Sequence, residues 1–213
     1  MTDLVITEDA HTPAAPRPPR SRAIGESLAK SEEKFLIDTD KRPWSREAFS
    51  KALELRSCGA VGGWRLWSEA RQALELGPPV ADIESHVDRL EIAVEGPPEP
   101  RATRYMIALM VAAFPNGKPA DIDVYCETLL HDAVSMGFTP QVVARACRTL
   151  RHTAKFLPSV SEFIEAGTEA KSDLDRARRH SVMMRDLLRQ AAAIASQPEP
   201  TSKSDARSEA AIP

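Results

Sequence analysis

The chain has 213 residues, of which 42% are hydrophobic and 28% charged, so it is long enough for one ordinary domain or two small ones. Its formal net charge of -3 excludes a strong overall field toward nucleic acid or an anionic membrane, so any such affinity has to be local. The three cysteines form no CxxC pair, which argues against a disulfide framework and against a zinc site.

The start of the chain, MTDLVITEDA, has neither a basic region nor a long apolar stretch after it. No segment approaches the roughly 18 apolar residues that a bilayer requires. We therefore expect a cytoplasmic protein. Its 17 prolines gather in short clusters that divide the chain into blocks, at 13–19, 78–79, 97–100 and 198–200.

Residues 1–42 mix proline, alanine and charge with almost no hydrophobic period, which predicts a disordered arm. Three arginines lie close together within it, at Arg17, Arg20 and Arg22. This cluster suits either a phosphate or acidic partner, or an ordinary solvated linker.

Residues 43–95 predict a small helical unit. Ser45 can cap its first helix, with Trp44 before it and Phe49 after it as a hydrophobic staple. Two further helices follow at helical spacing, one from Trp64 and one from Val80 to Val94. Trp64 and Trp67 are interpreted as core residues, and a base-stacking platform is the alternative.

Residues 101–166 predict a four-helix core block. Its first helix is apolar almost all round, and its second places Ile122, Cys126, Leu129, Ala133 and Met136 on one side. Gly137 can end that helix, Thr139 can cap the next one, and Pro140 occupies a first helical position where its missing N–H costs nothing.

The third helix of this block carries a basic stripe opposite its apolar face. Arg145, Arg148 and His152 fall at i, i+3 and i+7, with Arg151 and Lys155 alongside. Such a stripe can meet DNA phosphates or an acidic partner, and an ordinary solvated face is an equally open interpretation.

The stretch FLPSVSEF, residues 156–163, predicts a sharp corner before a long last helix. Pro158 stops the preceding segment, Ser159 can cap the helix, and Glu162 completes a capping box. Apolar or small residues then recur every 3.5 residues up to Ala195. Since more than half of them are Gly, Ala or Ser, we expect residues 167–196 to form a projecting arm that needs a partner.

The predicted contacts of this arm are Leu174, Met184 and Leu188, toward a second copy of the chain or another protein. The run DRARRH at 175–180 on the same arm is interpreted as solvated, with contact to nucleic acid as the alternative. Residues 197–213 are expected to form a disordered tail.

The sequence offers no pattern typical of catalysis or of metal binding. The five histidines (His11, His86, His131, His152 and His180) are scattered, and none lies in a metal-binding motif. His131 and Asp132 are adjacent but point about 100° apart on a helix, so they do not by themselves make a base and its orienting group. We therefore predict no enzymatic activity, no cofactor and no metal.

Three stretches of residues 106–166 resemble a known family: LMVAAFPNG, LLHDAVSMGFTPQVVARACRTL and KFLPSVSEFIEA. They are similar to the phage loader-and-inhibitor proteins of replicative helicases and to related small replication proteins of prophages. The counterparts of the family's positions are Phe114-Pro115, Tyr125 with Leu129, residues 142–150, and Phe156, Pro158, Ser159 and Glu162. Tyr125 stands where the family has Trp, and the unit before residue 96 has no counterpart.

The resemblance implies a compact four-helix domain, a mobile C-terminal segment that meets the helicase, and a role in delivering or restraining the helicase at a phage origin. On this basis we expect a non-enzymatic replication adaptor in the cytoplasm of a bacterial host. Its partner is a replicative helicase or another replication protein, and DNA contact is open. The alternatives are a prophage DNA-binding regulator and a structural protein that oligomerises through its C-terminal helix.

Overall fold

The computed structural model describes residue 36 and residues 41–58, 63–114 and 119–200. Within these ranges the chain forms helices and no strand, so the predicted all-α fold is confirmed there. The helices are α2 (Arg46–Cys58), α3 (Trp64–Leu76), α4 (Val80–Glu95), α5 (Pro100–Ala112), α6 (Ile122–Ser135), α7 (Pro140–Thr153) and α8 (Val160–Ala195). The arginine cluster near residue 20, most of the predicted disordered arm (residues 1–42) and most of the predicted tail (residues 197–213) lie outside the described residues.

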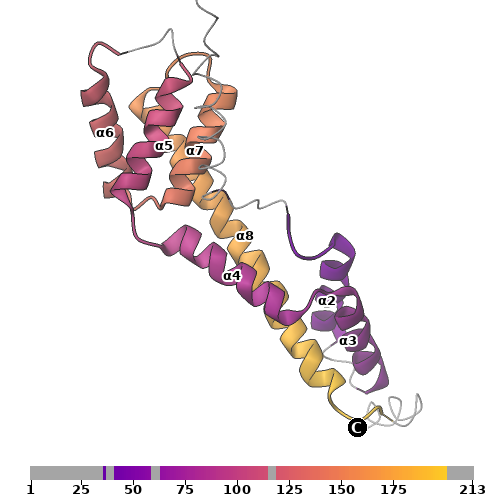
Figure 1. Cartoon of the computed structure of the whole chain (residues 1–213). Helices are drawn as coiled ribbons and strands as arrows, with labels where there is room; N and C mark the ends of the chain where they lie inside the picture. Colours follow the sequence, from indigo (N-terminus) through magenta and orange to yellow (C-terminus); the bar gives the residue numbers. More distant parts are fainter. Residues whose placement is uncertain (1–35, 37–40, 59–62, 115–118, 201–213) are drawn as a thin grey trace, which may run out of the picture.

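The 36-residue helix α8 forms the long axis of the molecule (Figure 1). At 1.5 Å per residue it is about 54 Å long, far longer than the helices around it. Helices α5, α6 and α7 gather beside its first part, α4 runs along its middle, and α2 and α3 pack on its last part. The result is an elongated molecule with a helical group at each end.

The larger group is the block made by α5, α6, α7 and the start of α8. Its core buries apolar side chains from all four helices and from the α6–α7 turn, the largest being Met106, Ile107, Met110, Leu129, Phe138, Phe163 and Leu174. The local signals are as predicted: Thr139 Oγ1 accepts the Val142 N–H at 3.3 Å, and Pro140 begins α7. These four helices thus share one continuous core.

Helix α4 belongs to both ends of the molecule, although the sequence placed it wholly in the first unit. Its second half joins the core of the block through Leu90, Ala93 and Val94. Its first half contributes Ile83 and Val87 to the other end. In addition, the buried hydroxyl of Thr139 donates to the Ala93 carbonyl, which ties the start of α7 to α4. The two units thus share a helix and do not separate at residues 96–100.

The end formed by α2, α3 and the last part of α8 has two small apolar clusters. One contains Trp44, Ala48, Ala52, Ile83, Val87, Met184, Leu187 and Leu188. The other contains Leu55, Ala70, Ala73 and Ala191. Alanine is frequent in both, so the helices approach closely while little apolar area is buried per residue.

The prediction that residues 167–196 project as an arm in need of a partner is wrong. The 3.5-residue seam exists, but α2, α3 and α4 of the same chain cover it. Leu174 is 2% exposed and Met184 and Leu188 are fully buried, so their predicted role as contacts to another protein is also wrong. Small residues in the seam leave room for neighbouring side chains: at Gly167, for example, a Cβ would lie 2.3 Å from the Phe138 ring.

Two residues of α6 that were expected to face inward are exposed. Ile122 is 38% exposed in the first turn, and Met136, just after the helix, is 47% exposed. Only the central positions of the stripe, Leu129 and Ala133, are fully buried, and α6 lies at the edge of the block (Figure 1).

Candidate partner-binding face on α7 and the corner after it

Hydrogen bonds hold the corner between α7 and α8. The Ser159 hydroxyl oxygen accepts the Glu162 N–H at 3.2 Å, and the Glu162 carboxylate accepts the Ser159 N–H at 2.6 Å, so the predicted capping box is present. This backbone donor lowers the pKa of the Glu162 carboxyl group, because it stabilises the charged form.

Helix α6 contributes another hydrogen bond to the corner. The phenol of Tyr125 donates a hydrogen bond to the carbonyl of Pro158, at the centre of the corner. Burial, together with nearby groups, raises the pKa of Tyr125 to about 12, so the phenol stays protonated and can donate throughout the physiological range. The corner is therefore fixed both along the chain and from a neighbouring helix.

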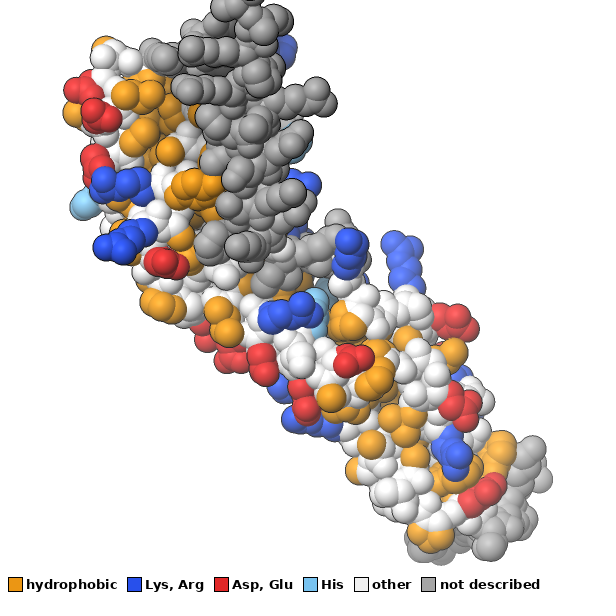
Figure 2. Space-filling model, viewed as in Figure 1, with side chains coloured by type: hydrophobic (Ala, Val, Ile, Leu, Met, Phe, Trp, Pro, Cys, Tyr) orange, Lys and Arg blue, Asp and Glu red, His pale blue; other side chains and the backbone are white. Residues whose placement is uncertain are grey.

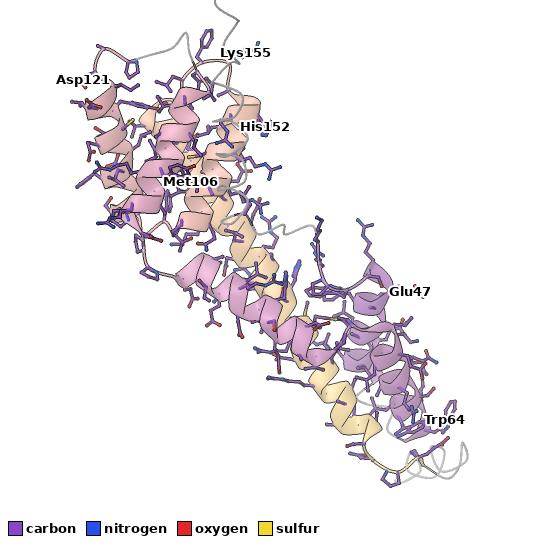
Figure 3. All side chains as sticks on the ribbon, in the orientation of Figure 1. Glu47, Trp64, Met106, Asp121, His152 and Lys155 are labelled. Carbon is purple, nitrogen blue, oxygen red and sulfur yellow. The ribbon has the colours of Figure 1, made fainter. Side chains whose placement is uncertain are left out.

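The five residues of the basic stripe lie on α7 and directly after it. Arg148, His152 and Lys155 are exposed, whereas Arg145 and Arg151 are half-buried. Arg145 reaches toward α8, where its Nη2 lies 3.7 Å from Asp173 Oδ2. Figure 3 shows His152 and Lys155 toward the end of α7 that leads into the corner.

Part of this stripe has a structural explanation. Arg151 and His152 lie in the last turn of α7, where positive charge complements the helix dipole. Arg148, His152 and Lys155 are the exposed basic residues of the stripe. We call these three residues together with Phe156 the corner face.

Phe156 is the member of the corner face that the sequence did not single out as exposed. Its side chain is 79% exposed, the highest value among the large apolar residues described. Val124, 61% exposed, belongs to the first turn of α6, one residue before the Tyr125 that contacts the corner. An aromatic in a capped corner has the same sequence signature whether it packs or not, so only the structure distinguishes the two cases.

The two tryptophans of α3 are half-buried, so the interpretation of both as core residues is wrong in part. The indole Nε1 of Trp67 donates to the Gln197 carbonyl at 3.1 Å, and the Arg71 guanidinium lies 5.0 Å from the ring centroid. One face of Trp67 is thus occupied by a cation–π contact, which weakens the alternative of a base-stacking platform.

Charged side chains of both signs are interspersed over the face seen in Figure 2, in keeping with the low net charge. Within the described ranges, no group of three or more His, Cys, Asp and Glu residues is placed to hold a metal ion. Among the described helices, none is long and apolar enough to cross a membrane.

By its described residues this is an elongated all-helical protein with an exposed aromatic residue, Phe156, in the corner after α7 and three exposed basic residues on α7 and directly after it. Comparisons with protein-family models, curated proteins and solved structures find no match to the chain.

Proposed function

We propose that this chain is a phage or prophage replication adaptor that binds a replicative helicase and loads or restrains it, without an enzymatic activity of its own. The proposal has two parts. The resemblance of residues 106–166 supplies the class of partner, and the corner face supplies the binding surface.

The observation that carries the proposal is the exposure of Phe156 on a corner that Tyr125 and Glu162 hold rigid. An exposed aromatic side chain costs free energy in water, and a partner recovers it by burying the ring. Aromatic and basic residues are also enriched among the residues that dominate protein interfaces. Because the corner is fixed beforehand, binding loses little conformational entropy there.

The test is binding of the purified replicative helicase of the bacterial host to immobilised full-length chain. Phe156→Ser should weaken this binding at least tenfold, because truncation of a hot-spot residue costs about 2 kcal/mol or more and about 1.4 kcal/mol already corresponds to tenfold. Ile92→Ser is the matched control, since Ile92 is 62% exposed on α4 away from the corner. Equal binding by both variants and the unmodified chain would refute the role of the corner face.

Truncation after residue 167 would not serve as this test. It would remove the buried seam of α8 and with it part of both cores, so loss of binding would report unfolding. Point substitutions at exposed positions avoid this ambiguity.

A prophage DNA-binding regulator is the second candidate, favoured by the exposed basic residues of the corner face. Replacing Arg148, His152 and Lys155 together with Ala should then lower DNA affinity and flatten its dependence on salt, by about 0.9 in the logarithmic slope for each phosphate that is no longer neutralised. Arg46, Arg65 and Arg101, exposed elsewhere, give the control triple variant. Helicase binding that resists nuclease, with no measurable DNA binding, would reject the regulator.

A further inference from the structure

A groove lies between the last turns of α2 and the second half of α8, away from the corner face. It has a volume of about 580 Å³ and is lined by Arg56, Arg178, Arg179, Val182, Met183, Asp186, Leu187 and Gln190. All of these except Arg56 come from one side of α8.

The floor of the groove is apolar. Leu187 is 4% exposed and belongs to the core of this end, while Val182 and Met183 are half-buried against the same cluster. Such a floor can receive an apolar side chain but gives no favourable contact to a free phosphate or another small hydrated anion.

The rim of the groove has an excess of positive charge. Arg178 pairs with Glu95 and Asp175, and Arg179 shares Asp175. Arg185, just outside the groove, lies 3.0 Å from Asp186. These three arginines therefore face three carboxylates, so the charges of this part of the rim balance.

Arg56 supplies the excess. The only hydrogen bond of its guanidinium that the described residues show is to the thioether of Met183, with Nη1 3.9 Å from Sδ. Sulfur is a weak acceptor, so this contact leaves most of the donor capacity of the guanidinium for a carboxylate. A planar guanidinium beside an apolar floor suits a carboxylate that is carried next to an apolar side chain.

We propose that this groove is a second docking site, and that it takes an acidic amphipathic peptide segment of a partner protein. The apolar side chain of that segment lies on Val182, Met183 and Leu187, and a neighbouring carboxylate pairs with Arg56. This site is separate from the corner face and does not depend on the helicase proposal.

Three synthetic dodecapeptides test the charge and the apolar requirement separately. The first has leucine at helical i, i+3, i+4 and i+7 positions and glutamate elsewhere. The second replaces glutamate with lysine, and the third replaces leucine with serine. Each is titrated into full-length protein carrying ¹³C-methyl methionine, because Met183 is one of six methionines and reports directly on the floor of the groove.

The leucine–glutamate peptide should shift the Met183 methyl signal in a saturable way and leave the signals of Met106 and Met110 unchanged, since these are buried in the other core. The lysine and serine peptides should cause no saturable shift. Met183→Leu assigns the signal.

Arg56→Gln should weaken binding of the first peptide about fivefold, the loss expected for one partly exposed charge pair. Arg46→Gln, an exposed arginine at the other end of α2, is the matched control and should bind unchanged. The proposal is overturned if no peptide shifts Met183, if the lysine peptide shifts it equally, or if Arg56→Gln binds as tightly as the unmodified protein.

Discussion

The two ends of the molecule use the same helix in different ways. In the four-helix block, α8 packs against aromatic and large aliphatic side chains, and Phe114, Phe138 and Phe163 all belong to that core. At the α2–α3 end, half of the buried residues that surround α8 are alanines, namely Ala48, Ala52, Ala70 and Ala73. Since hydrophobic stabilisation grows with the apolar area buried, the block should be the more stable part and the α2–α3 end should open first.

The largest expected effect is on the block. Phe163 is fully buried in the first turn of α8, so Phe163→Ala should lower the free energy of unfolding by about 3–5 kcal/mol, from lost transfer energy and the cavity left behind. Chemical denaturation measures it. Phe156→Ala, seven residues earlier and exposed, should change stability by less than about 0.5 kcal/mol. Similar losses in both variants would contradict the described burial.

A core truncation at the other end should have a smaller and more local effect. Leu188 is fully buried and lies close to Gly77 at the end of α3. We expect Leu188→Ala to cost about 2–4 kcal/mol. Amide hydrogen exchange should accelerate in α2 and α3 while α5, α6 and α7 keep their protection. Uniform acceleration in all helices would instead mean that α8 couples the two ends into one cooperative unit.

Helix limits and caps could be predicted from the sequence because their signals are local. The Ser159–Glu162 capping box and the Thr139-Pro140 start of α7 depend on residues within one turn of each other. Their outcome is the same whatever packs around them, so α7 and α8 begin where the sequence indicates.

The partner of α8 could not be predicted, because a 3.5-residue seam indicates a covered face without identifying what covers it. The many small residues of the seam indicate weak packing, yet one of them, Gly167, makes room for the Phe138 ring. In the same way, the even helical pattern of α4 does not reveal that Ile83 and Leu90 enter different cores. Exposure of Phe156 also depends on contacts distant in the sequence.

Gly167 gives an intermediate effect that probes this close approach. Gly167→Ala should destabilise the protein by about 1–3 kcal/mol, because the Phe138 ring has to move from a fully packed site. The favourable helix propensity of alanine offsets up to about 1 kcal/mol of that cost. Combining Gly167→Ala with Phe138→Leu should lose less than the sum of the single losses, and strict additivity in thermal unfolding would exclude direct contact.

The smallest expected effect is a pH dependence of the α2–α3 end, centred on His86. The imidazole is buried on α4, edge-on to Trp44 with ring centroids 5.9 Å apart, and Arg89 Nη2 lies 3.5 Å from its Nδ1. Burial, and secondly the charge of Arg89, lower the pKa of His86, since both disfavour the imidazolium.

The pKa of His86 is lower in the folded than in the unfolded chain, so protonation of this imidazole favours the unfolded chain. The free energy of unfolding therefore keeps the full contribution of neutral His86 above the unfolded-state pKa, near 6.5. This contribution is lost as the pH falls from that pKa toward the folded-state pKa. The loss is smaller than in the core truncations because protonation removes no packing atoms.

The measurement is the free energy of unfolding at about pH 7.5 and about pH 5.5, on either side of the unfolded-state pKa, for the unmodified chain, His86→Gln and the exposed control His131→Gln. His86→Gln should lose less stability between the two pH values than the other two proteins. An equal loss in all three would mean that His86 does not set the acid sensitivity of this end.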